Sequence, residues 1–431
     1  MKVLVIGSGG REHAIVWKLR QNLPSENIYC APGNGGIGRD ATIVPIAVSH
    51  IGELLRFARN EGIDLTVVGP EQPLVDGIVD EFERNGMKIF GPSKSAARLE
   101  GSKAFAKRFM EKYGIPTATF RVFSSREKEA AKKYVRSSNN SFVVKADGLA
   151  AGKGVVVCGS PGEAEEAIDA LTSSEDFGVS GERIVIEECL RGEEVSVFVL
   201  TDGDRYALLP PAQDHKRVSD GDTGKNTGGM GAYAPAPVLT GELATRVEQD
   251  IVLPVLGGMR EEGTPYRGCL YIGIMLTQEG PKVLEFNCRF GDPEAQVVIP
   301  LIDGDFGSLL LSIAGRTFDP ARLRLREASC VCVVLASGGY PGPYTTGKTI
   351  LGLGKFVPDD ESVIFHAGTK RVGDGYQTAG GRVLGVTAIG GEGELGTTIR
   401  RAYEAVSKIS FDGMHYRTDI GKKALHPLRV A

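Results

Sequence analysis

The sequence predicts an α/β protein that begins with a Rossmann-like parallel-sheet domain and ends in a small β-rich domain resembling a lid. Two patterns support this prediction. Up to residue 101, strand-like apolar runs alternate with helical runs, and glycine-rich turns follow the strands. After residue 327, short strand-like runs at 362–368 and 381–390 accompany one helical run at 395–409.

The composition is that of a globular enzyme. The chain has 431 residues, of which 42% are hydrophobic and 24% charged, and this length suggests about two to four domains. A formal net charge of -4 predicts no nucleic-acid partner, and no apolar run is long enough to predict a membrane span. The N-terminal run reads as a strand rather than a secretion signal. Cys330 and Cys332 lack companion ligands, which predicts core thiols. We therefore expect a cytoplasmic enzyme with small-molecule substrates.

The first strand-like run, Val3–Ile6, precedes Gly7-Ser-Gly-Gly-Arg-Glu-His13 and a helical run at 14–21. Strand, glycine turn and helix in this order are typical of a dinucleotide-binding start. However, the third glycine is missing, and no acidic residue follows the next strand, Ile28–Cys30, to hold a ribose hydroxyl. The motif thus argues against NAD and predicts a phosphate site at a helix N-terminus. The predicted phosphate-binding residues are Gly9, Gly10 and Arg11. Helices at 51–60 and 75–85 and strands at 65–68 and 89–90 complete the predicted sheet.

Two features that follow carry lysines. A helical stretch at 93–113 places Lys103 and Lys107 one turn apart on one face, where two solvated lysines are the simplest interpretation. Next come a strand, a loop of small residues and a second strand, over Phe142–Val157. The backbone amides of such a loop can close over phosphates. Lys145 lies in the incoming apolar strand, where a lysine is costly without an anion, so we predict that it binds a ligand.

Two strands joined by an acidic hinge extend from Arg183 to Leu200. A nucleotide could use the hinge backbone for its base and one carboxylate for its ribose. The following loop, at 210–237, is long, polar and rich in glycine. Loops of this length inside a compact domain are usually functional or disordered.

The stretch Val283–Gln296 gathers the most chemistry, after a strand at 271–277 predicted to pair with one at 282–286. Glu285 and Asn287 are two residues apart, so they share one face of an extended strand. They form a suitable pair of oxygen ligands for a hard cation that also holds nucleotide phosphates. Arg289 continues the same parity and could clamp a carboxylate or phosphate. Each residue alone fits a solvated strand end, but together they favour a catalytic site.

One motif of the C-terminal region is predicted to be misleading. Gly342–Thr349 matches the P-loop pattern letter for letter. Pro343 and Tyr344 occupy positions that need small residues with free amides, and the next residues read as β-like rather than helical. We therefore predict no phosphate loop here. The polar run Tyr416–Gly421 is predicted to be structural.

In this order, the motifs resemble the ATP-grasp superfamily and, within it, the glycinamide ribonucleotide synthetase family. The resemblance covers essentially the whole chain, and the run from Arg289 to Gln296 is close to diagnostic. The motifs that carry it are Gly7-Ser-Gly-Gly-Arg-Glu-His13, Gly69-Pro-Glu71, Val144–Gly154, Glu187-Glu188, Asn226–Gly231, Arg289–Glu294 and Tyr416-Arg417.

The resemblance implies a carbon–nitrogen ligase that converts ATP, glycine and 5-phosphoribosylamine into glycinamide ribonucleotide, ADP and phosphate through glycyl phosphate. This is the second step of de novo purine biosynthesis. The implied domains are an N-terminal Rossmann-like domain (1–101), an ATP-grasp domain (102–326, with 118–195 as a mobile subdomain) and a C-terminal domain (327–431). The implied cofactor is Mg²⁺ or Mn²⁺, with ATP as co-substrate, and the expected state is a monomer.

The resemblance also implies roles for individual residues. The catalytic residues would be Lys145, Arg289 and Asp292, and the metal ligands Glu285 and Asn287. ATP would be bound by Lys103, Lys145, Gly148, Gly152, Lys153, Gly154, Glu187, Glu188, Leu190 and Glu194. The other substrates would be bound by Gly9, Gly10, Arg11, Asp214, Lys216 and Arg289. Charge complementarity suggests Asp214 for the glycine ammonium and Arg289 for its carboxylate.

Three questions stay open at this point. Gly273 and Met275 stand where many relatives carry another metal-binding acid, so the metal has fewer ligands or Glu294 or another acid substitutes. A sister ATP-grasp carboxylase or transformylase would share the fold but should lack the run Arg289–Glu294. A non-catalytic nucleotide-sensing protein would need no metal pair at Glu285 and Asn287.

Overall fold

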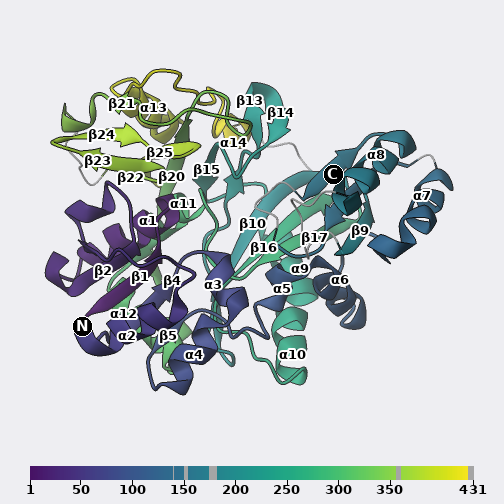
Figure 1. The fold of residues 1–431 in the computed structure, drawn as a ribbon, viewed down its shortest axis with the longest axis horizontal. Coiled ribbons are helices and arrows are strands. Elements are labelled where there is room, and N and C mark those ends of the chain that lie inside the picture. Colours follow the sequence, from purple (N-terminus) through teal and green to yellow (C-terminus); the bar gives the residue numbers. More distant parts are fainter. Residues whose placement is uncertain (139, 150–153, 174–181, 356–360, 426–431) are drawn as a thin grey trace.

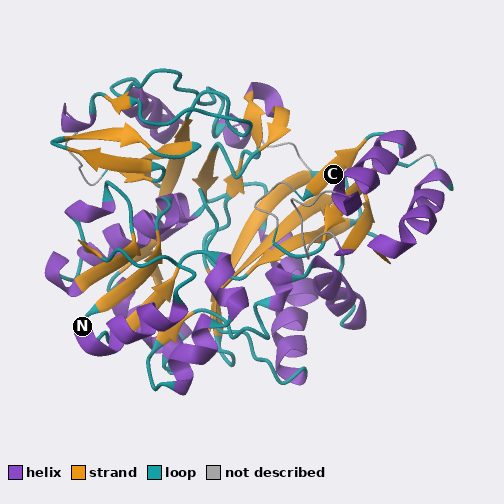
Figure 2. Cartoon of the chain, in the orientation of Figure 1, coloured by secondary structure: helices purple, strands orange, loops and turns teal. Residues whose placement is uncertain are grey.

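The computed structural model describes residues 1–138, 140–149, 154–173, 182–355 and 361–425 (Figure 1). The N-terminal elements form one group, the C-terminal elements lie above it in the view, and the remaining sheets extend to the right (Figure 2). The predicted α/β architecture, with a parallel N-terminal sheet and a β-rich C-terminal region, is confirmed.

The N-terminal sheet is entirely parallel. Its strand order is β3 (Thr42–Ile43), β2 (Ile28–Pro32), β1 (Val3–Gly7), β4 (Leu65–Val68) and β5 (Ile89–Phe90). Strands β2 and β3 are added on one side of β1, and β4 and β5 on the other. In open parallel sheets, ligands bind in the crevice where the strand order reverses in this way. The surrounding helices are α1 (Gly10–Arg20), α2 (Ile51–Glu61), α3 (Glu71–Asp76) and α4 (Ile78–Arg84). The helix predicted at 75–85 is divided by Gly77, whose φ of +98° ends α3.

The helix predicted at 93–113 is also two helices, α5 (Arg98–Gly101) and α6 (Lys103–Lys112). Ser102 separates them in an extended conformation, and its hydroxyl accepts a hydrogen bond from the Phe105 amide to cap α6. This cap fixes where the lysines of α6 begin, and α6 contacts both β9 (Arg183–Glu188) and β17 (Gly280–Asn287).

Two antiparallel sheets form the middle of the molecule. One consists of β11 (Tyr206–Leu208), β10 (Glu193–Thr201), β16 (Gly268–Thr277) and β17. The other consists of β6 (Phe120–Ser124), β9, β7 (Phe142–Ala146) and β8 (Val155–Cys158). The helices α7 (Lys128–Arg136) and α8 (Pro161–Ser173) pack against this second sheet and share a separate apolar core with it. The helices α9 (Gly241–Val247) and α10 (Leu253–Glu261) are joined by a π-helical turn, and α9 contacts β17.

The C-terminal sheet draws strands from two distant parts of the chain. Its order is β12 (Gln213–Asp214), β15 (Gly231–Ala234), β20 (Ala328–Ala336), β25 (Arg382–Gly391) and β22 (Ser362–His366). The loop predicted at 210–237 therefore enters this sheet twice. Between those entries it forms the hairpin β13 (Arg217–Ser219) and β14 (Thr223–Asn226), which lies beside α14 (Lys422–Leu425) in Figure 1. The helix α13 (Leu395–Val406) packs on β20 and β25.

Shorter elements complete the described chain. The connecting helices are α11 (Ala295–Val298) and α12 (Phe306–Ala314), and the remaining strands are β18 (Ile302–Asp303), β19 (Arg324–Leu325), β21 (Thr349–Ile350), β23 (Thr369–Val372) and β24 (Gly375–Thr378). Cys330 and Cys332 are buried free thiols, as predicted.

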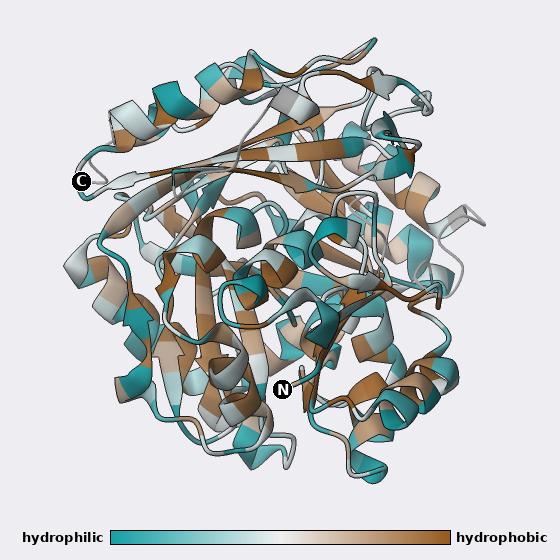
Figure 3. Cartoon of the chain, turned by 90° about the vertical axis from the view of Figure 1, so that its left-hand side faces the viewer, coloured by the Kyte–Doolittle hydropathy of each residue, from teal (hydrophilic) through white to brown (hydrophobic). Residues whose placement is uncertain are grey.

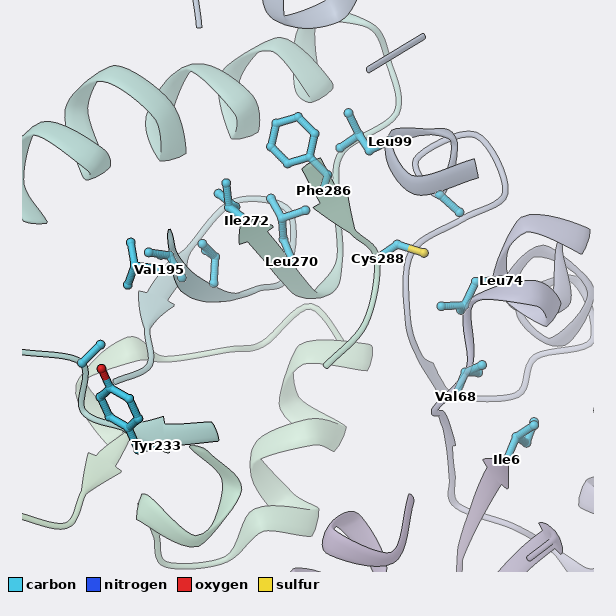
Figure 4. Packing of buried hydrophobic residues seen from close by; sticks show 14 of the residues in the cluster. Ile6, Val68, Leu74, Leu99, Val195, Tyr233, Leu270, Ile272, Phe286 and Cys288 are labelled. Atoms are coloured by element: carbon cyan, nitrogen blue, oxygen red, sulfur yellow. The ribbon is translucent and has the colours of Figure 1, made fainter. Parts of the chain in front are cut away.

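The apolar residues of the sheets lie inside, and most hydrophilic residues lie on the outer helices and loops (Figure 3). One cluster crosses from the N-terminal sheet to the central one. Figure 4 shows Val68 of β4 and Leu74 of α3 facing Cys288, which follows β17, and Phe286 of β17 beside Leu99 of α5. Because apolar burial is the main favourable term in folding, this shared cluster fixes the two sheets relative to each other.

Candidate active site

The loops that follow β1 and β4 meet at Glu12, in the first turn of α1. The Glu12 carboxylate accepts hydrogen bonds from the Gly9 amide (2.5 Å) and from Arg11 Nε (2.7 Å). A Cβ placed at Gly7 or Gly69 would lie within 2.4 Å of Glu12 atoms, so both positions need glycine for packing reasons. Glu12 thereby joins both loops to the N-terminus of α1.

The predicted phosphate-binding residues lie at this point. The predicted order of strand, turn and helix is present, but α1 begins at Gly10, four residues before the helix predicted at 14–21, and Gly9 precedes it. The Arg11 side chain is buried and committed to the protein, because Nε binds Glu12 and Nη1 donates to the Phe290 carbonyl at 3.1 Å. The predicted phosphate site therefore depends on the amides at the N-terminus of α1 more than on the Arg11 guanidinium.

Asp292 lies in the turn that follows β17 and is held by two partners. Gln296 Nε2 donates to Asp292 Oδ1 at 2.9 Å, and Arg382 Nη1 lies 3.4 Å from the same oxygen. Burial raises the pKa of Asp292, but Arg382 and Arg11 outweigh it and hold the pKa below its usual value. Asp292 is therefore ionised at neutral pH.

Arg382 is a site residue that sequence reasoning missed. It lies on β25 of the C-terminal sheet, and Nη1 also donates to the carbonyl oxygens of Gly228 (2.5 Å) and Asp292 (2.6 Å). Gly228 belongs to the glycine-rich run 226–231, and its amide donates a hydrogen bond to the Tyr340 hydroxyl at 3.0 Å. The signal in the sequence is weak: two glycines precede an arginine in an ordinary strand.

Arg289 is bound by two carboxylates of the protein. Its Nε lies 3.2 Å from Glu71 Oε2, and Nη2 lies 2.9 Å from Glu100 Oε1. Burial lowers the pKa of Arg289, but Glu100 and Glu71 outweigh it and raise the pKa above its usual value. Glu100 also accepts hydrogen bonds from the amide (2.7 Å) and thiol (2.9 Å) of Cys288. Nη1 also donates to the Phe290 carbonyl at 3.4 Å, so each nitrogen of the predicted clamp has a partner in the protein.

Glu285 and Asn287 share one face of β17, as strand parity predicted. They lie opposite Gly273 and Tyr271 on β16. A Cβ placed at Gly273 would lie 3.2 Å from Glu285 Cγ, so the glycine leaves room for this side chain. Burial raises the pKa of Glu285, but nearby cations outweigh it and hold the pKa below its usual value. These cations are Lys216, Lys145, Lys103 and Arg289.

Lys216 lies in the middle of a group of acids. Its Nζ is 3.0 Å from Glu194 Oε2 and 3.8 Å from Glu285 Oε1. Burial lowers the pKa of Lys216, but Glu194, Tyr271, Asp214 and Glu285 outweigh it and raise the pKa well above its usual value. The Lys216 ammonium is thus stabilised next to Glu285, one of the two predicted metal ligands.

Asp214 and Glu294 complete this acidic group. Burial raises the pKa of Asp214 well above its usual value; Lys216 opposes this shift, while Glu294, Glu194 and Glu285 add to it. Glu294 is 4% exposed and accepts a hydrogen bond from the Ser196 hydroxyl at 3.3 Å. Excess negative charge of this kind favours binding of a second cationic group.

The lysines predicted to bind ATP each have partners in the protein. Lys103 Nζ donates to the Gly148 carbonyl at 2.7 Å, and Lys145 Nζ donates to Glu187 at 3.0 Å and to the Leu284 carbonyl at 3.2 Å. Gly148 adopts a φ of +86°, which favours glycine. Of the predicted loop residues, Gly152 and Lys153 lie outside the described residues, and the Gly154 carbonyl accepts the Ala146 amide at 2.8 Å.

The two glutamates of the acidic hinge, Glu187 and Glu188, lie in different environments. Glu187 is 2% exposed and lies between Lys145 and Lys107, whose Nζ is 2.9 Å away. The Lys107 prediction is thus wrong, because this lysine is buried rather than solvated. Glu188 Oε1 accepts the Thr119 amide at 3.0 Å, and Leu190 is half-buried beyond it.

Two negative predictions hold. The P-loop look-alike is followed by β21 and not by a helix, and Lys348 pairs with Asp412 at 2.6 Å. Arg417 is fully buried and structural: it binds Asp419 through Nε and Nη2 (both 2.7 Å) and Asp222 through Nη1 (2.8 Å). Asp222 belongs to the β13–β14 turn, so Arg417 anchors the hairpin that follows Lys216.

No three His, Cys, Asp or Glu side chains in the described part of the chain are grouped as a metal site. None of the described helices is both long and apolar enough to cross a membrane.

Comparison with known proteins gives matches along nearly the whole chain. Three family models match: phosphoribosylglycinamide synthetase N domain over residues 1–100, ATP-grasp (A) domain over 101–295 and C domain over 330–423.

Individual relatives match at full length. The chain is 48% identical over 428 residues to the phosphoribosylamine–glycine ligase of Vibrio vulnificus strain YJ016, covering 99% of each. It is 49% identical over 431 residues to that of Chlorobaculum tepidum, covering 99% of this chain and 100% of the relative. A crystal structure of phosphoribosylamine–glycine ligase from Thermotoga maritima superposes with a TM-score of 0.82 at 36% identity, covering 97% of this chain and 100% of the other.

Proposed function

This chain belongs to the phosphoribosylglycinamide synthetase family, and we propose that it is an ATP-dependent ligase that joins glycine to 5-phosphoribosylamine. The full-length match to relatives named phosphoribosylamine–glycine ligase is the observation that carries this proposal. Membership of this family also disfavours a sister carboxylase or transformylase as the identity of the chain.

We assign the nucleotide to the region bordered by Lys103 of α6, Lys145 of β7 and the strand β17. Lys103 and Lys145 would contact the phosphates beneath the loop 148–154. The backbone from Glu188 to Leu190 would hold adenine and Glu194 the ribose. Glu187 would act on ATP through Lys145, because its carboxylate already lies between two lysines.

The metal assignment fits the residues present. Glu285 is kept ionised by the surrounding cations, as an oxygen ligand of a hard cation must be. Glu285 and Asn287 would hold Mg²⁺ or Mn²⁺, which when bound would neutralise phosphate charge. Two protein ligands suffice where phosphate oxygens and water supply the others.

The other substrates fit the two remaining groups of residues. The glycine ammonium would lie against Asp214, next to Lys216, and the glycine carboxylate would face Arg289. The phosphate of phosphoribosylamine would bind at Gly9 and Gly10 on the N-terminus of α1, with Arg11 adding positive charge. A Cβ placed at Gly9 would lie 3.2 Å from Asp292 Oδ2, so Asp292 lies beside the proposed phosphate site.

The proposed reaction has two steps, phosphorylation of glycine and attack of the amine on the resulting glycyl phosphate. A glycine carboxylate oxygen attacks the γ-phosphorus of ATP, the bond to the β-phosphate oxygen breaks, and ADP leaves glycyl phosphate behind. The amine of phosphoribosylamine then attacks the glycyl carbonyl, phosphate leaves, and the amine loses a proton. The first step depends on positioning and charge neutralisation, which Lys103, Lys145 and Arg289 supply. Asp292, ionised and next to the sugar-phosphate site, would accept the proton of the second step.

The test is ADP release by the purified protein with ATP, Mg²⁺ and glycine, with and without freshly generated phosphoribosylamine. We expect ADP formation that requires both acceptor substrates. Activity with bicarbonate or formate in place of glycine would refute the assignment and favour a sister family. Absence of ADP under all these conditions would favour a nucleotide-sensing protein. We further propose a cytoplasmic monomer, to be checked by light scattering.

A further inference from the structure

Lys107 has no role in the assignments above, yet its charge is enclosed in the site. It lies on α6, one turn after Lys103, and its side chain is 3% exposed. Its Nζ lies 2.9 Å from Glu187 Oε2, donates to Thr117 Oγ1 at 2.7 Å and lies 5.9 Å from the centre of the Phe120 ring. A lysine is seldom buried so completely without a specific partner.

Glu187 is shared between Lys107 and Lys145. Lys145 Nζ lies 3.0 Å from each Glu187 oxygen. The strand register explains this contact, because Glu187 lies opposite Val143 on β7, which makes Lys145 its diagonal neighbour on the same face. Three different elements, α6, β7 and β9, therefore bring these charges together.

The network ends on β17, next to the proposed metal ligands. The Thr117 hydroxyl donates to the Val283 carbonyl at 2.7 Å, and Lys145 donates to the Leu284 carbonyl at 3.2 Å. These carbonyls immediately precede Glu285. The Lys107 network thus connects the β7–β9 sheet to the strand that carries Glu285.

The charges in this network do not cancel. Two ammonium groups share one carboxylate, which leaves one positive charge in a poorly solvated region, where an unbalanced charge is costly. Lys145 has three N–H donors, and Glu187 and the Leu284 carbonyl use two of them. The third donor and the surplus charge are available to an anionic ligand.

We propose that Lys107 is a positioning residue that half-neutralises Glu187, so that Lys145 keeps a net positive charge and a free donor for the polyphosphate of ATP. This inference rests on the proposed function, because it takes ATP as the ligand of Lys145. Without Lys107, Glu187 and Lys145 form a closed neutral pair that attracts phosphate weakly.

The titration of Lys107 supports this assignment. Burial, together with the charge of Lys145, lowers the pKa of Lys107 to about 8, although Glu187 and Glu188 on β9 oppose the shift. Below that pH Lys107 carries its charge and the surplus is present. As the pH rises through that value, Lys107 loses its proton and the surplus disappears, so ATP affinity falls.

The decisive experiment compares Lys107→Met with the double variant Lys107→Met/Glu187→Gln. We measure KM for ATP and, separately, binding of a non-hydrolysable ATP analogue with Mg²⁺. Lys107→Met should weaken both by about tenfold or more, with KM for glycine nearly unchanged. The double variant restores the surplus charge on Lys145 and should recover most of the affinity. Lys112→Met is the matched control, because Lys112 lies on the same helix in an exposed pair with Glu262.

Two further measurements separate positioning from a purely structural role. In the wild type, kcat/KM for ATP should fall above about pH 8, and Lys107→Arg should move this fall to higher pH because a guanidinium keeps its proton. Circular dichroism verifies that each variant is folded, and if Lys107→Met fails to fold, Lys107→Arg and the double variant decide the question.

Equal loss of affinity in the single and double variants, or no loss in Lys107→Met, would overturn the inference. Analogue binding tests this inference even if the wild type forms no ADP. Failure of the ligase function and failure of the Lys107 assignment are therefore distinguishable.

Discussion

The guanidinium group of Arg382 lies 3.4 Å from the Asp292 carboxylate, although Arg382 is on β25 of the C-terminal sheet and Asp292 is in the turn after β17 of the central sheet. The same Arg382 nitrogen donates to the Gly228 carbonyl. One side chain of the C-terminal sheet thus holds both the turn after β17 and the glycine-rich loop at 226–231. The C-terminal sheet is therefore a direct part of the proposed site.

Arg382→Met should lower kcat about a hundredfold, because loss of a buried charged partner costs roughly 2–5 kcal/mol of favourable interaction. Steady-state kinetics with all three substrates would measure this loss, and ATP analogue binding should stay close to wild type. Arg322→Met is the control, because Arg322 is 86% exposed and pairs with Asp319 on the surface. An Arg382→Met enzyme with wild-type kcat would show that the contact to Asp292 is dispensable.

Asp214→Asn should raise KM for glycine selectively, by about tenfold, because the amide cannot form an ion pair with the glycine ammonium. The pKa of Asp214 is raised by burial. A protonated carboxyl cannot pair with an ammonium either, so in the wild type KM for glycine should rise as the pH falls through that raised pKa. Asp214→Asn should abolish this dependence, and the exposed Asp204→Asn should not. An unchanged KM for glycine in Asp214→Asn would place the ammonium elsewhere.

Glu285→Gln should raise the Mg²⁺ concentration needed for half-maximal activity by at least about tenfold, because a neutral amide is a weaker ligand for a hard cation. Metal titrations at saturating ATP would measure this change. Glu279→Gln lies on the same hairpin and pairs with Lys282 at the surface, so it serves as the control. If both variants have the same metal requirement, Glu285 is not a metal ligand.

Arg417→Met should destabilise the protein by about 2–4 kcal/mol, because Asp419 and Asp222 lose a fully buried partner. The shift in the urea unfolding midpoint measures this loss, with Arg400→Met on the exposed side of α13 as the control.

The acid limb of the stability curve gives an independent check on Arg417. Burial raises the pKa of Asp419, but Arg417 outweighs it and the pKa is lowered in the folded state. This contribution is present above the unfolded pKa of about 3.9 and is lost as the pH falls through the lower folded value. Wild type and Arg417→Met should therefore converge in acid, and a constant difference down to low pH would contradict the ion pair.

Local sequence patterns predicted one part of the site well. Glu285 and Asn287 share a strand face because the side-chain period of a strand is two, and a helix follows the turn after β1, although it begins at Gly10 and not at the predicted residue 14. Neither prediction needed a distant partner.

What the sequence could not predict depends on long-range partners. Lys107 looked solvated because Glu187, its counter-ion, is on another element. Arg289 looked free because Glu71 and Glu100 come from helices far earlier in the chain. The strands β12 and β15 are only two and four residues long, too short for a periodic signal, so their place in the C-terminal sheet was not foreseen.

The pairing of β12 and β15 with strands of the C-terminal sheet has a consequence for synthesis on the ribosome. Asp214 lies on β12, which pairs with β15, and β15 pairs in turn with β20 at Ala328–Ala336. A growing chain can complete the N-terminal and central sheets before β20 has been made. The strand carrying Asp214 acquires its place only after translation has passed that point. The nascent chain would therefore assemble the proposed phosphate-binding lysines early and the proposed glycine site late, so the proposed active site is complete only after β20 has been synthesised.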